Sequence, residues 1–360
     1  MPKPLKILFV PIRCAPFYAT MLEHRPLGGT ETAIIRVSEQ LSKMGHDVYI
    51  YQETELPPTQ EGPQYISIKE FVNIEQFDAV IVIRGLLELF KDWKSKKCFL
   101  WMSDAYKSLK TYGIGDKRIV QRLDGLFLLS QWHVDTLCNA SGFPKNKTWV
   151  VNNGIHPDYF LGSETRLPKR LIYTSAPDRG LIYMPRIYEE LKRRHSDLEL
   201  HVFSSLDRYF TGWSPGPRFQ ENAKLYDLLS AMPGCTLHGS VLQKDLAREF
   251  MKSSVFVYPS NFEETSCISA MEAMAGGCAV VTSDLGALRE TVQGGGIYIE
   301  APPGSEAYIH QFIEKVDELL THPTRLQELS RAGLKRASQL TWENAAKNMT
   351  NYLTNYHHLG

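Results

Sequence analysis

Two successive sets of short apolar runs constrain the fold of this chain more than any other feature. The first set begins at Lys6, Asp47, Asp78, Cys98, Gly125 and Thr148, and the second at Arg170, Leu198, Cys235, Val255, Ala279 and Gly296. Most runs are continuous rather than alternating, which is typical of parallel strands covered on both faces. Helical segments lie between several of them, most clearly at Thr30 to Met44. The pattern predicts two doubly wound, Rossmann-like α/β domains.

Chain length and one polar segment suggest where the two domains divide. At 360 residues the chain exceeds what a single hydrophobic core usually serves. Residues 161–169 are polar and contain both Gly and Pro, which marks a boundary. We therefore predict a first domain over residues 1–160 and a second over 161–340. A final helix over 341–360 is expected to pack back on the first domain.

Charge and cysteine content narrow the class of protein. Lys plus Arg and Asp plus Glu both number 40, so the formal net charge is zero. A nucleic-acid partner recognised through its phosphate backbone is therefore not expected. The six cysteines form neither a CxxC pair nor a zinc spacing. Reduced thiols of this kind favour a cytoplasmic protein.

Membrane contact, if it occurs, is predicted to be peripheral. No segment approaches the roughly 18 uninterrupted apolar residues that suggest a membrane span. A lysine-rich stretch from Lys91 to Lys97, with Lys107, Lys110, Lys117 and Arg118 beyond it, could contact anionic lipid at the inner face of a membrane, or an acidic acceptor. A solvated helix face is the alternative explanation.

The segment from Tyr258 to Gly277 contains the strongest candidate site. A buried strand stops at Pro259, a polar loop follows, and a helix of small residues ends at Gly276-Gly277. Thr265 or Ser266 is predicted as the N-cap of this helix. Glu264 and Glu272, eight positions apart, would flank free N–H groups and the positive end of the helix dipole. Such a place can hold a phosphate or a sugar hydroxyl.

This segment resembles the E-x(7)-E signature of retaining family 4 glycosyltransferases, which have the GT-B fold and use nucleotide-sugar donors. The spacing alone is weak evidence, because Glu31/Glu39 and Glu306/Glu314 share it. The frame carries the resemblance: strand, PS, polar loop, helix, EAMAGG and the next strand. GGTE from Gly28, the segment from Ser130 to Phe160, SAPDRGL from Ser175, HGSV from His238 and TWE from Thr341 also fit that family. The resemblance implies two domains that face each other across a cleft.

The resemblance assigns donor-binding roles to the predicted helix and its loop. It implies that Glu272 accepts hydrogen bonds from the ribose hydroxyls and that Glu264 contacts hydroxyls of the transferred sugar. Backbone N–H groups of Thr265, Ser266 and Cys267 would face sugar or phosphate. The alternatives are a helix-surface glutamate at 272 and a glutamate at 264 that only complements the helix dipole.

Further site residues follow from the same resemblance. Arg179 stands where the family usually has lysine and would bind the diphosphate; an ion pair with Asp178 is the alternative. The second basic residue of the family is replaced by Tyr173. The loops Gly28-Gly29 and Gly239-Ser240 would approach the donor through their backbones, the latter at the base. A tight turn would also explain Gly28-Gly29.

Ser103-Asp104 is the second departure from the family, since relatives often carry a histidine there. Asp104, at the end of a predicted strand, could act on the acceptor hydroxyl, and helix capping is an equally good explanation. Glu31 could either orient an acceptor or complement the helix dipole.

These observations predict a retaining hexosyltransferase. The expected donor is a nucleotide-diphosphate sugar, UDP-glucose first, and the expected acceptor is a glycan or a lipid-linked glycan in polysaccharide or lipopolysaccharide synthesis. The chain has no D-x-D pair, so metal-independent transfer without a further cofactor is predicted. The alternatives are another GT-B enzyme, such as a nucleotide-sugar epimerase or a phosphorylase, and a catalytically silent sugar-nucleotide or glycan-binding protein. A dehydrogenase is disfavoured because no G-x-G-x-x-G follows the first strand. The oligomeric state is not predicted.

Overall fold

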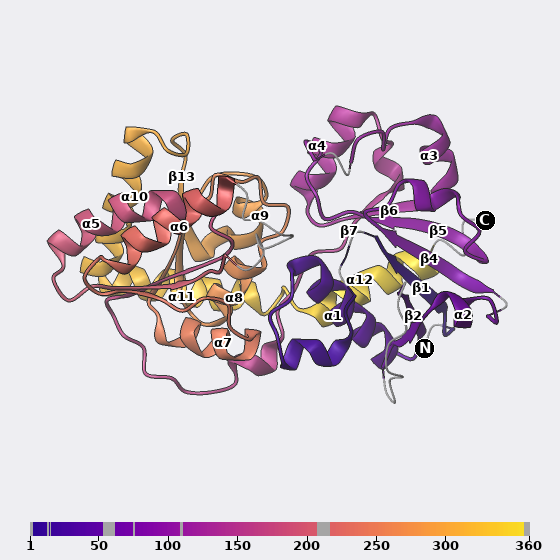
Figure 1. Ribbon diagram of the computed structural model, residues 1–360, viewed down its shortest axis with the longest axis horizontal. Helices are drawn as coiled ribbons and strands as arrows, with labels where there is room; N and C mark the ends of the chain where they lie inside the picture. The colour runs from indigo at the N-terminus through magenta and orange to yellow at the C-terminus, as the bar shows by residue number, and fades with distance from the viewer. Residues whose placement is uncertain are drawn as a thin grey trace. The chain divides into compact units, whose positions relative to one another are not determined.

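The protein divides into two compact units. A computed structural model describes residues 3–12, 14, 16–52, 62–74, 76–108, 111–206 and 217–355. The first unit comprises Met1–Gly154 and Leu340–Gly360, and the second comprises Ile155–Gln339. Each unit contains one parallel sheet with helices, so the predicted class of two doubly wound α/β domains is confirmed (Figure 1).

The first unit is built on a seven-stranded parallel sheet. Its strand order is β3-β2-β1-β4-β5-β6-β7. The strands are β1 (Lys6–Pro11), β2 (Asp47–Tyr51), β3 (Gln64–Ile66), β4 (Phe77–Ile83), β5 (Ser95–Trp101), β6 (Gly125–Leu128) and β7 (Thr148–Val150). The central strands β1 and β4 are buried along nearly their whole length, because both faces of the sheet are covered.

The helices of the first unit include one from the far end of the chain. They are α1 (Gly29–Lys43), α2 (Ile68–Phe71), α3 (Lys117–Arg122), α4 (Gln131–Ser141) and α12 (Trp342–Asn355). Helix α12 packs along α1 (Figure 1). The ring of Tyr352 stacks on Trp149 with centroids 5.4 Å apart, and Thr350 Oγ1 lies 3.3 Å from His46 Nε2. The last helix therefore completes the core of the first unit.

The second unit is contiguous in sequence and has a six-stranded parallel sheet. Its strand order is β10-β9-β8-β11-β12-β13. The strands are β8 (Arg170–Thr174), β9 (Glu199–Phe203), β10 (Cys235–Leu237), β11 (Val255–Tyr258), β12 (Ala279–Ser283) and β13 (Gly296–Ile299). The strand order reverses beside β8 and β11. In such sheets ligands bind outside the carboxyl ends of the strands at this point.

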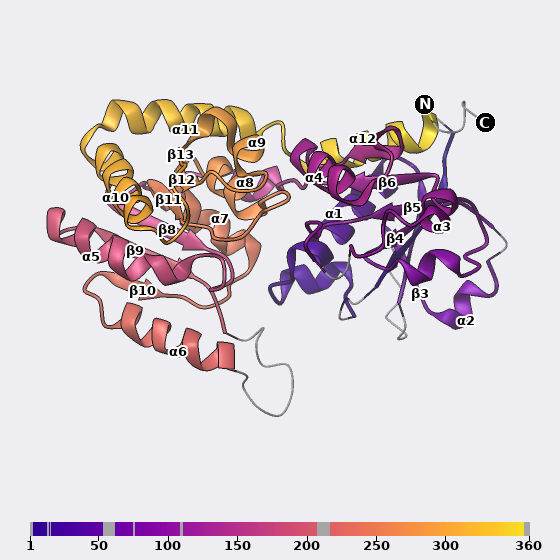
Figure 2. The ribbon, with the colours of Figure 1, turned by 90° about the horizontal axis from the view of Figure 1, so that it is seen from above.

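The described part of the second unit contains seven α-helices. They are α5 (Met184–Arg194), α6 (Pro217–Ser230), α7 (Gln243–Lys252), α8 (Ile268–Ala275), α9 (Leu288–Val292), α10 (Glu306–Thr321) and α11 (Pro323–Ala337). Helix α6 packs beside the edge strand β10, whereas α10 packs against both α5 and α11 (Figure 2). In the described residues no helix is both long and apolar enough to span a bilayer.

Candidate active site

Glu264 lies in the loop between β11 and α8, where Tyr258 holds its carboxylate. Tyr258 is the last residue of β11, and its phenol donates a hydrogen bond of 2.7 Å to Glu264 Oε1. Burial raises the pKa of Glu264 above its ordinary value, although Arg179 and the Tyr258 hydrogen bond favour the ionised form. A carboxylate buried in this way is suited to accept hydrogen bonds from a ligand that displaces water.

Arg179 lies beside Glu264, in the turn after β8. Its Nε is 3.8 Å from Glu264 Oε1, and its guanidinium carbon lies 3.2 Å from the centre of the Phe262 ring. The ring holds the cation flat while leaving its edge available for donation. Within the described residues no ion pair joins Arg179 to Asp178, so the alternative partner considered above is not the one observed.

The turn that carries Arg179 is fixed by two buried contacts. The Tyr173 phenol donates to the carbonyl oxygens of Ala176 and Arg179, at 3.1 and 3.2 Å. Gly180 has φ +88°, and a Cβ there would lie 1.9 Å from the Pro259 carbonyl oxygen. Tyr173, which replaces the basic residue of the resembled family, is thus fully buried and supports the backbone of the turn.

Helix α8 begins later than predicted. Its N-cap is Cys267, so the prediction of Thr265 or Ser266 as N-cap is wrong. Those two residues instead belong to a buried loop that is held by Gly286 and Ala287. The Ala287 N–H donates to the Glu264 carbonyl at 2.7 Å, and a Cβ on Gly286 would lie 2.5 Å from the same oxygen. This close approach keeps the chain out of the helix until Ile268.

Glu272 is buried within α8 and has a partner from α7. It is 8% exposed, so it is not the helix-surface glutamate of the alternative explanation. Gln243, the first residue of α7, donates through Nε2 to Glu272 Oε1 at 3.2 Å. Sequence reasoning missed Gln243, because a polar residue at the start of a helix gives no sign of a partner far along the chain.

The loop after β10 leaves backbone accessible at Gly239. Gly239 has φ +71°, and a Cβ there would meet nothing within 4 Å. The preceding His238 ring stacks on Phe203 with centroids 4.3 Å apart, which anchors the loop to the end of β9. Gly239 and Ser240 therefore form an open turn in the same unit as Glu264 and Glu272.

Asp104 in the first unit is held by an arginine. It follows β5 in a turn, and no described helix begins there, since α3 starts at Lys117; helix capping is therefore not its role. Its Oδ2 lies 2.7 Å from Arg84 Nε. His133, in the first turn of α4, is fully buried and its ring nitrogen lies 3.0 Å from the Asp104 carbonyl oxygen. Burial lowers the pKa of His133 to about 4, so the ring is neutral at physiological pH.

Gly28 and Gly29 form the start of α1, also in the first unit. Gly28 is the N-cap and Gly29 the first helical residue. The carboxylate of Glu31 folds back over this turn, because a Cβ on Gly28 would lie 2.5 Å from Glu31 Oε2. Thr30, the next residue of the helix, has its hydroxyl 3.3 Å from Ser103 Oγ. The structure thus brings the N-terminus of α1 beside Ser103-Asp104.

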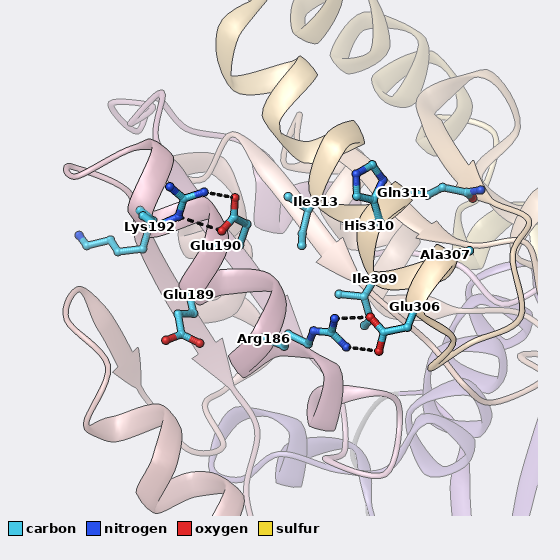
Figure 3. Close-up of a pocket in the computed structure, with 11 residues that line it drawn as sticks. Arg186, Glu189, Glu190, Lys192, Glu306, Ala307, Ile309, His310, Gln311 and Ile313 are labelled. Atoms are coloured by element: carbon cyan, nitrogen blue, oxygen red, sulfur yellow. Dashed lines mark hydrogen bonds and ion pairs between the residues drawn. The ribbon is translucent and has the colours of Figure 1, made fainter.

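A surface groove between α5 and α10 holds none of these residues. It is lined by charged and apolar side chains, among them Arg186, Glu190, Glu306, Ile309, His310 and Ile313 (Figure 3). Arg186 and Glu306 form a bidentate ion pair across it. Exposed ion pairs of this kind are common on solvated protein surfaces and contribute little energy, so this groove is not a candidate for the active site. In the described residues no group of three or more His, Cys, Asp or Glu side chains is arranged to hold a metal ion.

Comparison with known proteins shows a similarity to glycosyltransferases. Residues 170–322 match the family model for glycosyl transferases group 1. A lipopolysaccharide 1,2-N-acetylglucosaminetransferase of Salmonella typhimurium is 22% identical over 84% of this chain and 79% of its own length. An alpha-maltose-1-phosphate synthase of Mycolicibacterium smegmatis is 30% identical over 64% of this chain and 63% of its own length. Together these support a glycosyltransferase.

Two solved structures match nearly the whole chain. Sucrose-phosphate synthase of Thermosynechococcus elongatus superposes with a TM-score of 0.74 at 14% identity, covering 99% of this chain and 100% of its own. HepE of Anabaena, solved with UDP and glucose, gives 0.74 at 12% identity and covers 98% of this chain and 100% of its own. At such identities the likeness concerns the fold. The protein has the GT-B glycosyltransferase fold.

The segment that matches the family model contains most of the candidate site. Residues 170–322 include Arg179, Gly239, Ser240 and the whole stretch from Glu264 to Glu272. The matches to the Mycolicibacterium smegmatis enzyme and to three further curated relatives cover only 53 to 63% of those relatives' lengths. Donor, acceptor and stereochemistry therefore belong to the proposal that follows.

Proposed function

We propose that the protein is a retaining hexosyltransferase. It transfers a hexose to a hydroxyl of a glycan or lipid-linked acceptor in polysaccharide or lipopolysaccharide synthesis. The first donor that we expect is UDP-glucose, which supplies glucose. The observation that carries the proposal is the arrangement of Arg179 and Glu264, 3.8 Å apart beside α8, with Glu272 buried in that helix. UDP and glucose in the HepE structure, and the Salmonella relative that acts on lipopolysaccharide, support this donor and acceptor class.

The second unit has the groups that a nucleotide-sugar donor requires. Glu272 accepts hydrogen bonds from the two ribose hydroxyls, and the open backbone at Gly239-Ser240 contacts the base. Arg179 and the N–H groups of residues 265–267 bind the diphosphate, whose negative charge grows as it leaves. Glu264 contacts hydroxyls of the hexose.

The proposed transfer needs neither a metal nor a covalent intermediate. The acceptor oxygen forms a bond to the anomeric carbon on the face from which the diphosphate departs. The bond from that carbon to the diphosphate oxygen breaks, and the acceptor proton passes to the departing oxygen. Retention follows because entry and departure share a face. Arg179 stabilises the leaving group electrostatically in place of a metal ion.

The first unit is assigned the acceptor. Asp104 lies at the carboxyl end of β5, beside the N-terminus of α1, where a hydroxyl could donate to it. The same unit exposes Leu87 and Phe90, which are 81% and 54% accessible, next to the lysine-rich segment from Lys91. We assign peripheral contact with anionic lipid to this part of the first unit. Apolar side chains can enter the membrane interface while neighbouring lysines attract its negative charge.

A thermal-shift screen of nucleoside diphosphates and their sugars tests the donor. Stabilisation by UDP and UDP-glucose is expected, because a ligand that binds only the native state raises the melting temperature. Turnover of the best donor with glycan acceptors follows. Glu264→Gln and Arg179→Ala should lose transfer with the fold preserved, whereas Glu189→Gln and Arg331→Ala, on exposed helix surfaces, should not.

Two outcomes would reject the proposal in favour of its rivals. Conversion of the donor to an epimer without any acceptor would indicate a nucleotide-sugar epimerase. Binding of UDP-glucose without turnover on any acceptor would indicate a silent binding protein. Tyr173 and Asp104, which stand where the resembled family has other residues, are the reason for considering this rival.

A further inference from the structure

Arg84 occupies an unusual place and an unusual backbone conformation. It follows the last residue of β4, next to the carboxyl end of β5, and its φ is +64°. Residues with a Cβ rarely adopt this left-handed conformation, and where the fold imposes it the residue often has a function. The Arg84 N–H still donates to the Trp101 carbonyl, so the turn is tied to β5.

The Arg84 side chain connects the segments around Asp104. Its Nε lies 2.7 Å from Asp104 Oδ2 and 3.2 Å from Ser103 Oγ. Ser103 Oγ in turn lies 3.3 Å from Thr30 Oγ1 in the first turn of α1. His133 of α4 contacts the Asp104 carbonyl from within the core. Asp104 is therefore held at its carboxylate by Arg84 and at its backbone by His133.

The outer edge of the guanidinium is available to a ligand. Both side-chain interactions of Arg84 use Nε, and among the described residues no hydrogen bond or ion pair is given for Nη1 or Nη2. The side chain is only 17% exposed. A largely buried arginine whose two terminal nitrogens have no partner among the described residues presents a planar pair of donors.

The charges in these segments favour a neutral ligand. Among the described residues whose contacts are given above, Asp104 and Glu31 contribute two carboxylates and Arg84 contributes one positive charge. An added phosphate would increase the excess of negative charge, whereas sugar hydroxyls both donate to carboxylates and accept from a guanidinium. The chemistry suits adjacent hydroxyls of a sugar.

We propose that Arg84 is the positioning residue of the acceptor site. Its ion pair fixes the Asp104 carboxylate so that the carboxylate accepts a hydrogen bond from a hydroxyl next to the reacting one, and its terminal nitrogens donate to a further hydroxyl of the same sugar. This inference rests on the proposed transferase function. It explains how an aspartate can stand where relatives often have histidine, because the arginine supplies both the orientation and the missing donor.

The test compares acceptor kinetics with donor binding. Arg84→Asn keeps a residue that tolerates left-handed φ, and Arg84→Lys keeps the charge without the fork. With UDP-glucose as donor and core oligosaccharide released from lipopolysaccharide by mild acid as acceptor, Arg84→Asn should raise the acceptor KM and lower kcat, each by about tenfold. Arg84→Lys should recover little. Millimolar guanidinium should partly rescue Arg84→Asn, and stabilisation by UDP should not change.

A matched control and a double-mutant cycle separate positioning from folding. Lys145→Ala removes an exposed lysine–aspartate pair of the same unit and should leave the kinetics unchanged. Asp104→Asn combined with Arg84→Asn should cost less than the product of the two single effects, because both act on one interaction. A role limited to folding would lower stability without guanidinium rescue.

The inference and the proposed function fail in different ways. Unchanged acceptor KM and kcat in Arg84→Asn, with a wild-type enzyme that turns over, would overturn the role of Arg84 alone. A wild-type chain that neither binds UDP nor transfers would reject the proposed function, and this inference with it.

Discussion

Gly180→Ala should damage donor binding more than its size suggests. The left-handed conformation costs a residue with a Cβ roughly 1–2 kcal/mol, and Gly180 has φ +88°. The new Cβ would also lie 1.9 Å from the Pro259 carbonyl oxygen and must move by about 1 Å to reach 3.0 Å, below which such contacts essentially never occur. Overpacking of this kind adds about 1–3 kcal/mol. We expect a loss of about 2–5 kcal/mol in the free energy of unfolding.

Gly142→Ala is the matched control for the conformational part. Gly142 has φ +73°, but a Cβ there would meet nothing within 4 Å. The free energy of unfolding of Gly142→Ala should fall by only about 1–2 kcal/mol. The difference between the two variants, measured by urea unfolding of each, isolates the contact with Pro259.

The displaced turn carries Arg179, which links stability to function. A shift of about 1 Å in a positioning residue can cost up to about a hundredfold in rate. Gly180→Ala should therefore weaken UDP binding and transfer, measured by titration and by initial rates, whereas Gly142→Ala should change neither. Equal unfolding losses in the two variants, or unaltered UDP affinity in Gly180→Ala, would refute the reasoning.

Three further predictions address separate parts of the molecule. Because burial raises the pKa of Glu264 from its ordinary 4.5, the ionised carboxylate destabilises the native state once the pH exceeds that value. Glu264→Gln should then raise the free energy of unfolding at pH 7, with the gain vanishing below about pH 4.5, and should lower kcat by about 10²-fold or more; a less stable variant at pH 7 would contradict this. Gln243→Ala removes the hydrogen bond to Glu272 and should weaken UDP binding by about tenfold but leave 2′,3′-dideoxy-UDP binding unchanged, since that nucleotide lacks the hydroxyls; equal losses for both nucleotides would argue against the ribose contact. Leu353→Ala, at a position of α12 only 2% exposed, should cost the first unit about 2–5 kcal/mol in urea unfolding while UDP still stabilises the second; loss of UDP stabilisation would be the contrary result.

The sheets could be predicted because most of their strands are short apolar runs that can be recognised from neighbouring residues alone. Runs such as Val255–Tyr258 are short, continuous and apolar, and each predicted run coincides with a strand. Strand β3 was missed because Gln64–Ile66 is three residues long at a sheet edge, too short to establish a pattern. Local pattern is therefore enough for the fold class and most strands.

The candidate site shows where local pattern stops. The N-cap of α8 was misplaced because Gly286 and Ala287, well along the chain, hold the loop out of the helix. Arg84 and Gln243 were missed because each acts on a partner 20 or more residues away. A single sequence contains no information on which distant side chains meet, so such pairs become visible only in three dimensions.

The return of α12 to the first unit has a consequence for synthesis on the ribosome. The second unit is a continuous segment, Ile155–Gln339, and all of it is translated before α12 emerges. The first unit starts earlier but lacks Trp342–Asn355, which cover α1, until translation has passed the second. The unit that begins first is therefore the one that finishes last, and the side of α1 that packs against α12 stays without that partner while the other unit is synthesised.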